Sequence, residues 1–287
     1  MTNIASIIWN PSVEFFRLGS FPVRYYSMMW LIGLLAAYLL VKKYFKDTKI
    51  DMQRFEPLFL YCFLSILIGA RLGHCIFYEP GYYFSSFERF LEMLLPVSFH
   101  PHFQFTGYSG LASHGGTVGI FIGILLYSRK YGVRLLTVVD LICVATPFTA
   151  GCIRLGNLMN SEIIGKATGT DWGFVFARLG EDFPRHPAQL YEAIAYFIIF
   201  AVIGLIYRKH RELVGKGFYF GFCITTIFTF RFIVEFFKEV QSPWEENLPI
   251  DMGQILSIPF IIAGVLLIRY GIKNRFREVK HVLPVKK

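Results

Sequence analysis

The sequence predicts an all-α polytopic membrane protein with seven transmembrane helices. Its composition is 54% hydrophobic and 18% aromatic with only 17% charged residues, and its mean hydropathy is +0.48. A soluble domain carries more charge than this. Apolar runs recur along the chain, and all but the short third one have about the 17–25 residues that a bilayer-spanning helix needs. Basic residues follow alternate runs, as the positive-inside rule requires. We therefore treat residues 1–287 as one integral membrane domain.

The expected elements follow the apolar runs in order. Residues 1–24 are mixed and aromatic, which is typical of a segment lying on the membrane surface. The seven predicted spans are about Tyr25–Val41, Pro57–Tyr78, Gly115–Leu126, Leu136–Leu155, Pro187–Tyr207, Gly217–Phe237 and Met252–Tyr270. Most of the 29 Lys and Arg lie after the first, third, fifth and seventh spans. The rule then places the N-terminus outside and the C-terminus inside.

Two intervals between the spans predict structure on the outer side. Residues 79–112 are aromatic and poor in charge, and Phe87–Leu95 within them predicts a short amphipathic helix. Residues 156–187 form the longest polar interval and predict a small extracytoplasmic head, with a short strand at Trp172–Phe176. In the second span, small residues beside Arg71 predict close helix packing.

Charge and cysteine usage exclude several classes of protein. The net charge of +9 is explained by basic cytoplasmic loops, so we expect no nucleic-acid partner. The five cysteines lie in or beside apolar segments without a CxxC motif, which predicts small buried side chains rather than a disulfide scaffold or a zinc site. The N-terminus has no basic region followed by an apolar core and a small-residue cleavage site, so we expect no cleavable signal peptide.

The stretch from Gly151 to Gly165, GCIRLGNLMNSEIIG, is the first candidate site. It brings Arg154, Asn157 and Glu162 to the end of a hydrophobic run, where charges are costly unless they are paired or used. On a helix, Arg154 and Asn157 share one face. The alternative is a helix end whose Arg154 side chain extends to water.

Two further candidates lie at the third and sixth spans. His114 begins the third span ahead of two glycines, which suggests room for a ligand; a histidine titrates near physiological pH and can act as a general base. The alternative is a structural histidine. Arg231 and Glu235 form an i, i+4 pair, which either neutralises itself or supplies one guanidinium of an anion site. Two guanidiniums facing one cavity repel unless an anion such as phosphate lies between them.

The segment Pro184–Glu192 is a fourth candidate. Gln189 and Glu192 fall on one helical face after Pro187, which suits the first turn of a helix. An ordinary helix start explains this segment as well as a catalytic role does. Tyr26, at the outer start of the first span, fits either an aromatic belt or the site.

Five motifs in order, HGGTVG, GCIRLGNLMNSEIIG, PRHPAQLYE, FRFIVEFFKE and DMGQILSIP, resemble those of the bacterial phosphatidylglycerol–prolipoprotein diacylglyceryl transferases. The resemblance runs from Tyr26 to the seventh span. It implies a seven-span inner-membrane enzyme that moves the diacylglyceryl group of phosphatidylglycerol onto the lipobox cysteine thiol of a preprolipoprotein and releases glycerol phosphate. The implied partners are phosphatidylglycerol, the preprolipoprotein signal peptide and membrane lipids. No cofactor or metal is expected, since the lipid is itself the activated donor.

The resemblance also implies a set of site residues. Carried over by motif, they are Tyr26, His114, Arg154, Asn157, Glu162, Gly165, Arg231 and Glu235. We expect Arg154 and Arg231 to hold the lipid phosphate, the two glutamates to orient the arginines, Asn157 and Tyr26 to bind the glycerol or ester groups, and Gly165 to keep the head loop tight. His114 either accepts the thiol proton or orients the lipid head group. The chain departs from the family pattern at Ile227, where a tyrosine is expected.

Two other functions fit parts of this sequence. An anion transporter lined by Arg71, Arg154 and Arg231 predicts polar residues through the membrane depth and often repeated halves. The polar groups here gather toward one side, and the sequence shows no repeat. A non-catalytic lipid-binding protein leaves the groups around His114 and Arg154 without a chemical purpose.

Overall fold

The structure, a computed structural model, describes residues 6–19, 21–99, 102–105, 110–239 and 250–284. Its α-helices are α1 Tyr25–Asp47, α2 Phe55–Phe77, α3 Pro80–Tyr83, α4 Phe87–Leu94, α5 Ser113–Tyr131, α6 Leu135–Asn160, α7 Ala188–Lys209, α8 Phe218–Val234 and α9 Met252–Lys273. The strands are β1 Ile7–Trp9, β2 Glu14–Leu18, β3 Phe21–Arg24, β4 Val97–Ser98, β5 Gln104–Phe105 and β6 Phe174–Phe176. Short 3₁₀ turns are η1 Met52–Arg54, η2 Ala177–Leu179, η3 Arg211–Leu213 and η4 Glu235–Phe237.

Six helical segments among the described residues are long and apolar enough to cross a membrane, so the chain is a polytopic membrane protein. They are α1, η1 with α2, α6, α7, α8 with η4, and α9. The remaining predicted span, Gly115–Leu126, lies inside α5. This helix is not among the six because its apolar stretch is short. Polar residues and glycines precede this stretch, and Arg129 and Lys130 follow it.

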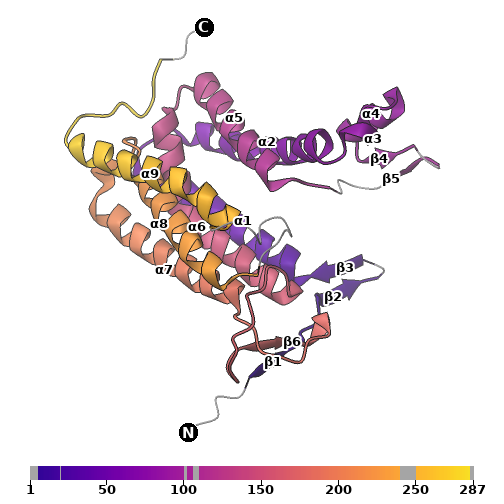
Figure 1. Cartoon of the computed structure of the whole chain (residues 1–287). Coiled ribbons are helices and arrows are strands. Elements are labelled where there is room, and N and C mark those ends of the chain that lie inside the picture. Colours follow the sequence, from indigo (N-terminus) through magenta and orange to yellow (C-terminus); the bar gives the residue numbers. More distant parts are fainter. Residues whose placement is uncertain (1–5, 20, 100–101, 106–109, 240–249, 285–287) are drawn as a thin grey trace. The chain divides into compact units, whose positions relative to one another are not determined.

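The chain divides into two compact units, which are described separately (Figure 1). Unit 1 contains residues 1–44 and 139–279, and unit 2 contains residues 45–138 and 280–287. Most of α1 and α6, together with α7 to α9 and the head, belong to unit 1. The helices α2 to α5 belong to unit 2.

Small residues set the helix spacing in unit 1. The Thr149 hydroxyl of α6 donates to the Gly33 carbonyl of α1 at 2.9 Å. Between α8 and α9, a Cβ added to Gly221 would lie 2.7 Å from the Gly264 carbonyl oxygen. Helices in lipid associate through such close backbone approach, because burial of apolar side chains supplies little driving force there.

A buried carboxylate joins α6 to the start of α8. Asp140 is fully buried. Its Oδ2 accepts backbone N–H bonds from Gly215, Lys216 and Gly217 at 2.9–3.1 Å, and its Oδ1 accepts one from Phe220 at 2.9 Å. The first N–H groups of a helix have no partner within the helix, so Asp140 satisfies them from a neighbouring helix and ties the two together.

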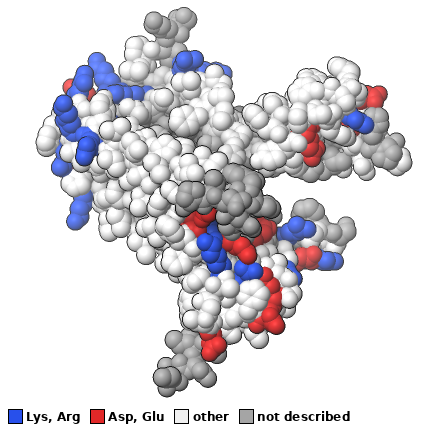
Figure 2. Space-filling view, viewed as in Figure 1, with Lys and Arg blue, Asp and Glu red and all other residues white. Residues whose placement is uncertain are grey.

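Charged side chains of unit 1 lie at the ends of its helices. Figure 2 shows basic residues gathered at one end of the α7–α9 bundle and a mixture of acidic and basic residues over the head, with an uncharged surface between. The basic end carries Arg208 and Lys209 of α7 and Lys273 of α9. This separation fits helices that cross a bilayer with a basic cytoplasmic side.

The head contains the predicted strand and an unexpected partner. The strand predicted at Trp172–Phe176 is confirmed as β6, which pairs in parallel with β1 from the N-terminal segment. The Trp9 indole also donates to the Leu158 carbonyl of α6 at 2.9 Å. The expectation of an all-α chain is therefore wrong in detail, since the N-terminal segment forms β1 and the β2–β3 hairpin. The helix α6 continues to Asn160, so the interval 156–187 predicted as the head begins within the last turn of this helix.

In unit 2, the predicted close packing around Arg71 is confirmed. A Cβ on Gly69 of α2 would lie 2.4 Å from the Gly115 carbonyl oxygen of α5, and one on Gly115 would lie 2.2 Å from the Gly69 carbonyl oxygen. Gly115 therefore makes room for a helix, not for the ligand we expected beside His114.

Arg71 is occupied within unit 2. Its Nη2 donates to the Glu92 carbonyl at 2.8 Å, and its guanidinium lies 5.0 Å from the centre of the Tyr83 ring. Glu92 belongs to α4, the predicted short amphipathic helix, which is confirmed as a helix. These contacts hold α4 against α2 and give Arg71 a structural task, in place of the transport path that the alternative function required.

Candidate active site

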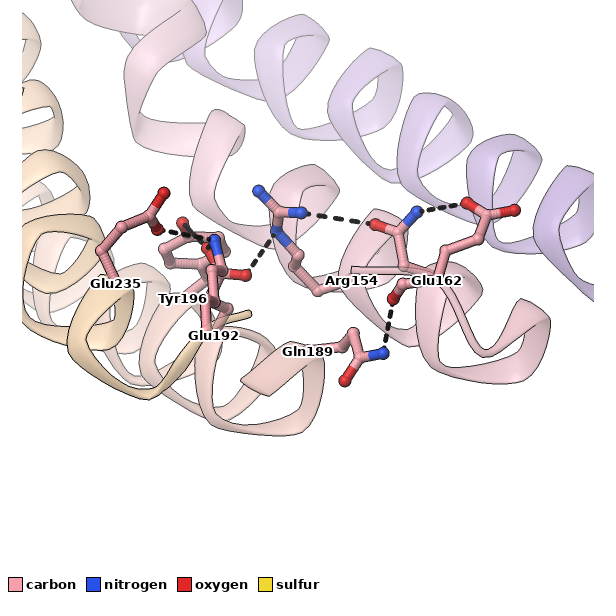
Figure 3. Close-up of polar contacts among 8 residues, drawn as sticks. Arg154, Glu162, Gln189, Glu192, Tyr196 and Glu235 are labelled. Atoms are coloured by element: carbon pink, nitrogen blue, oxygen red, sulfur yellow. Dashed lines mark hydrogen bonds and ion pairs between the residues drawn. The ribbon is translucent and has the colours of Figure 1, made fainter. Parts of the chain in front are cut away.

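A continuous series of polar side chains joins α6, α7 and the end of α8 in unit 1. We call it the polar row, and its members are Asn160, Glu162, Asn157, Arg154, Glu192, Lys238 and Glu235. Figure 3 shows Arg154 between Glu192 on one side and Glu162 on the other, with Glu235 beyond Glu192. The row places ionic groups at the head end of these helices.

The α6 part of the row confirms that Arg154 and Asn157 share one helical face. The Arg154 Nη1 lies 3.5 Å from Asn157 Oδ1, at the long limit for a hydrogen bond. The Asn157 and Asn160 amides both donate to the Glu162 carboxylate, at 3.2 and 2.7 Å. Glu162 is thus held by amides and not by the Arg154 guanidinium, which was its expected partner.

Glu192 is the central anion of the row. Its side chain is fully buried on α7, and its Oε2 lies 3.1 Å from Arg154 Nε. Its Oε1 accepts a hydrogen bond from the Tyr196 hydroxyl at 3.1 Å. A carboxylate buried in this way is costly unless it is paired, so Glu192 orients Arg154. Glu192 thus pairs with a residue of another helix, beyond what an ordinary helix start requires, and a catalytic role of the Pro184–Glu192 segment stays a prediction.

Lys238 closes the row from the end of α8. Its ammonium lies 3.3 Å from Glu192 Oε1 and 3.2 Å from Glu235 Oε2, and its side chain is 5% exposed. Among the described residues, the ion pair that Glu235 makes is with Lys238. The predicted Arg231–Glu235 pair does not form there, because Glu235 leaves α8 for the 3₁₀ turn η4, and its carboxylate faces Lys238.

Arg231 lies in the last turn of α8 and is half-buried. Within the described part of the chain, its guanidinium makes no hydrogen bond or ion pair. Both Arg231 and Arg154 lie within electrostatic range of the Tyr196 hydroxyl. Two guanidiniums on neighbouring helices therefore share one region of unit 1. Ile227, one turn before Arg231, presents no hydroxyl there.

Gly165 lies where three backbone segments meet, which we call the head crossing: residues 164–166, 184–186 and 237–239. The Gly165 N–H donates to the His186 carbonyl at 2.9 Å, and the Lys166 N–H donates to the Phe237 carbonyl at 2.8 Å. A Cβ on Gly165 would lie 2.4 Å from the His186 oxygen and 2.7 Å from the Phe237 oxygen. Gly165 therefore allows the head loop to be braced against α8.

Arg185 strengthens the head crossing. Its guanidinium donates to the Gly165 carbonyl at 3.2 Å and pairs with Glu181 and Glu239 at 2.6 and 2.7 Å. Its pKa is raised, mainly by the hydrogen bond to Glu181. Burial lowers the pKa of the neighbouring His186, so His186 is neutral at physiological pH. These two residues brace the loop.

Tyr26 packs against the stretch that carries Arg154. A Cβ on Gly156 of α6 would lie 2.9 Å from the Tyr26 ring and 3.3 Å from its Cα. Gly156 therefore gives the start of α1 a close approach to α6, one residue from Asn157. The structure brings Tyr26 into the neighbourhood of the site.

His114 belongs to unit 2, in the first turn of α5, and its side chain is exposed. The structure thus brings seven of the eight expected site residues into unit 1 and places His114 in the other unit.

Lys238 and Tyr196 are the residues that sequence reasoning missed. Lys238 lies just beyond the predicted span Gly217–Phe237 and follows Glu235 by three residues, a spacing at which a short helical turn brings side chains together. Tyr196 follows Glu192 by one turn inside an apolar run, where a tyrosine is hard to distinguish from core.

A multi-pass helical chain with a row of paired acidic and basic side chains at one end of its helices defines an integral membrane protein with a polar cluster among its helices. The chain belongs to the prolipoprotein diacylglyceryl transferase family, whose model matches residues 13–270. It is therefore an enzyme, a transferase.

Its similarity to individual relatives extends over nearly the whole chain. A phosphatidylglycerol–prolipoprotein diacylglyceryl transferase of Bacteroides fragilis is 55% identical over 274 residues, which is 94% of this chain and 98% of the relative. Proteins of the same name from Chloroherpeton thalassium and Porphyromonas gingivalis are 40% and 39% identical, each covering 96% of this chain, and 97% and 98% of the relatives.

Proposed function

We propose that this chain transfers the diacylglyceryl group of phosphatidylglycerol to the thiol of a lipobox cysteine in a preprolipoprotein and releases glycerol phosphate. It acts in the bacterial inner membrane, with membrane lipids around it. In this proposal α5 is the third of seven spans, the N-terminus is outside, and residues 156–187 contribute an extracytoplasmic head.

The observation that carries the proposal is the placement of Arg154 and Arg231 in unit 1. Arg154 uses Nε for Glu192 and Nη1 for a long contact with Asn157, so its guanidinium has capacity for an anion. A guanidinium suits bidentate binding of phosphate. We assign the lipid phosphate to these two side chains.

The reaction follows from this assignment. The cysteine thiolate attacks the glycerol carbon that carries the phosphate ester, the carbon–sulfur bond forms, and the carbon–oxygen bond breaks. The electron pair leaves on the phosphate oxygen, where Arg154 and Arg231 stabilise the developing charge. The proton lost by the thiol passes to a base, since the thiolate and not the thiol is the nucleophile.

The other site residues orient these groups. We assign Asn157 and Tyr26 to the glycerol or ester groups of the lipid. Glu162 orders the Asn157 amide through its hydrogen bond, and Glu235 orders Lys238. Neither glutamate is needed for acid–base work in this scheme.

The function is tested with purified protein, labelled phosphatidylglycerol and a lipobox peptide. We expect a thioether-linked diacylglyceryl peptide and free glycerol phosphate in equal amounts. A peptide with serine in place of cysteine is the control and should give no product. Transport of an anion, or lipid binding without thioether formation, would contradict the proposal.

His114→Gln separates the two roles open to His114. If His114 accepts the thiol proton, turnover should fall about 10²–10⁴-fold, the usual contribution of general base catalysis. The measurement is kcat in the thioether assay, with His102→Gln, a substitution of another exposed histidine of unit 2, as the control. Turnover within about threefold of wild type would leave His114 only the orienting role.

A further inference from the structure

We propose that Lys238 is a positioning residue for Arg154: it compensates the two carboxylates beside it, so that Glu192 orients Arg154 without neutralising it. The inference rests on the proposed function, because its consequence is the binding and departure of a phosphate. Lys238 follows η4 and is 4% exposed. A lysine is rarely buried to this extent unless it is paired.

The argument starts from the geometry of Glu192. One carboxylate oxygen lies 3.1 Å from Arg154 Nε, and the other lies 3.3 Å from Lys238 Nζ. Glu192 is fully buried, and its carboxylate is shared between Arg154 on α6 and Lys238, which follows η4. A shared carboxylate attracts each cation less than a carboxylate with a single partner does, since part of its hydrogen-bonding capacity is used elsewhere.

The second step is the charge balance. Arg154, Glu192, Lys238 and Glu235 alternate in sign along the polar row, so these four side chains together are neutral. Removing the Lys238 charge leaves two carboxylates with one guanidinium. The excess negative charge would lie near the place where the lipid phosphate binds, and low local dielectric makes it strongly repulsive. Glu192 would then engage Arg154 alone.

The third step is that the backbone holds Lys238 in place. Its neighbours lie in the head crossing, where the Phe237 carbonyl accepts from Lys166 at 2.8 Å and the Glu239 N–H donates to the Ile164 carbonyl at 3.2 Å. The ammonium is therefore presented from a braced segment. Through this segment the head loop that follows Glu162 is connected to the orientation of Arg154.

The test compares Lys238→Met, Lys238→Arg and the double variant Lys238→Met/Glu235→Gln in the full-length detergent-solubilised enzyme. Rates are measured over a range of phosphatidylglycerol concentrations and expressed per folded molecule, with the folded amount taken from size exclusion. Lys166→Met is the matched control, because Lys166 lies in the same head crossing but its side chain is exposed.

For Lys238→Met we expect kcat to fall about 100-fold, the loss typical of a catalytic group moved by about 1 Å. Lys238→Arg should stay within about fivefold of wild type, since it keeps the charge. The double variant should recover about tenfold over Lys238→Met, because it removes the excess negative charge. Lys166→Met should match wild type.

Two results would overturn the inference. One is an unchanged rate per folded molecule in Lys238→Met, even with a lower folded yield, which would make Lys238 purely structural. The other is no recovery in the double variant. A wild-type enzyme that forms no thioether product would instead overturn the proposed function, so the two failures are distinguishable.

Discussion

Arg154→Lys is expected to lower turnover about 10²–10³-fold, as removal of a group that stabilises transition-state charge typically does. The Arg154 guanidinium spans Glu192, through Nε at 3.1 Å, and Asn157, through Nη1 at 3.5 Å. An ammonium keeps the charge but not the planar fork, so it cannot hold Glu192 and present a second face to a phosphate. The measurement is kcat and KM for phosphatidylglycerol in the thioether assay.

Arg208→Lys serves as the control for this loss. Arg208 lies in the last turn of α7, at its basic end, and is exposed, so the same substitution should leave turnover unchanged. If Arg154→Lys kept more than about a third of wild-type turnover, bidentate binding of the phosphate by Arg154 would be ruled out. The turnover of Arg231→Lys, measured in the same assay, tests the second guanidinium.

Gly165→Ala is expected to reduce activity at least about 100-fold and to lower the yield of folded protein. Its Cβ would lie 2.4 Å from the His186 oxygen and 2.7 Å from the Phe237 oxygen. Both neighbours are backbone atoms in a hydrogen-bonded crossing, so neither can rotate away, and overpacking of this kind destabilises by about 1–3 kcal/mol or more. Two segments of the head crossing would be displaced: residues 237–239, which carry Lys238, and residues 164–166, which follow Glu162. The site would therefore be distorted.

The matched substitution is Gly204→Ala. Gly204 lies inside α7, and a Cβ there would meet nothing within 4 Å. Alanine favours helix over glycine by about 1 kcal/mol in water, so this variant should be as stable and active as wild type. Thermal unfolding in detergent and the thioether assay measure both variants. Wild-type behaviour of Gly165→Ala would show that the head crossing is dispensable.

The helices were largely predictable from the apolar runs. The first predicted span, Tyr25–Val41, became α1 Tyr25–Asp47, and the last, Met252–Tyr270, became α9 Met252–Lys273. Each helix continues past its apolar run, because helical hydrogen bonds do not depend on hydropathy. The strand β1 was not predictable, since its pairing partner β6 lies more than 160 residues away in the chain.

The candidate site was predictable in part. Motif and local spacing marked Arg154, Asn157 and Glu162, because their contacts are between residues at most five positions apart. The predicted pair of Glu235 with Arg231 is not found among the described residues. Two residues one helical turn apart meet only if the helix continues, and α8 ends at Val234. The glycine beside His114 was assigned to a ligand, but it accommodates α2.

By itself, the sequence determined that this is a multi-pass helical membrane protein, which residues carry charge into its apolar segments, and, through the order of five motifs, which family it resembles. These properties are local: apolar length, charge position and motif order can be read along the chain. Only the tertiary structure decided that Glu192 is shared by Arg154 and Lys238, and that Gly165 lies between two other backbone segments. Those relations join residues 21 to 72 positions apart, and their distances depend on how α6, α7 and α8 pack.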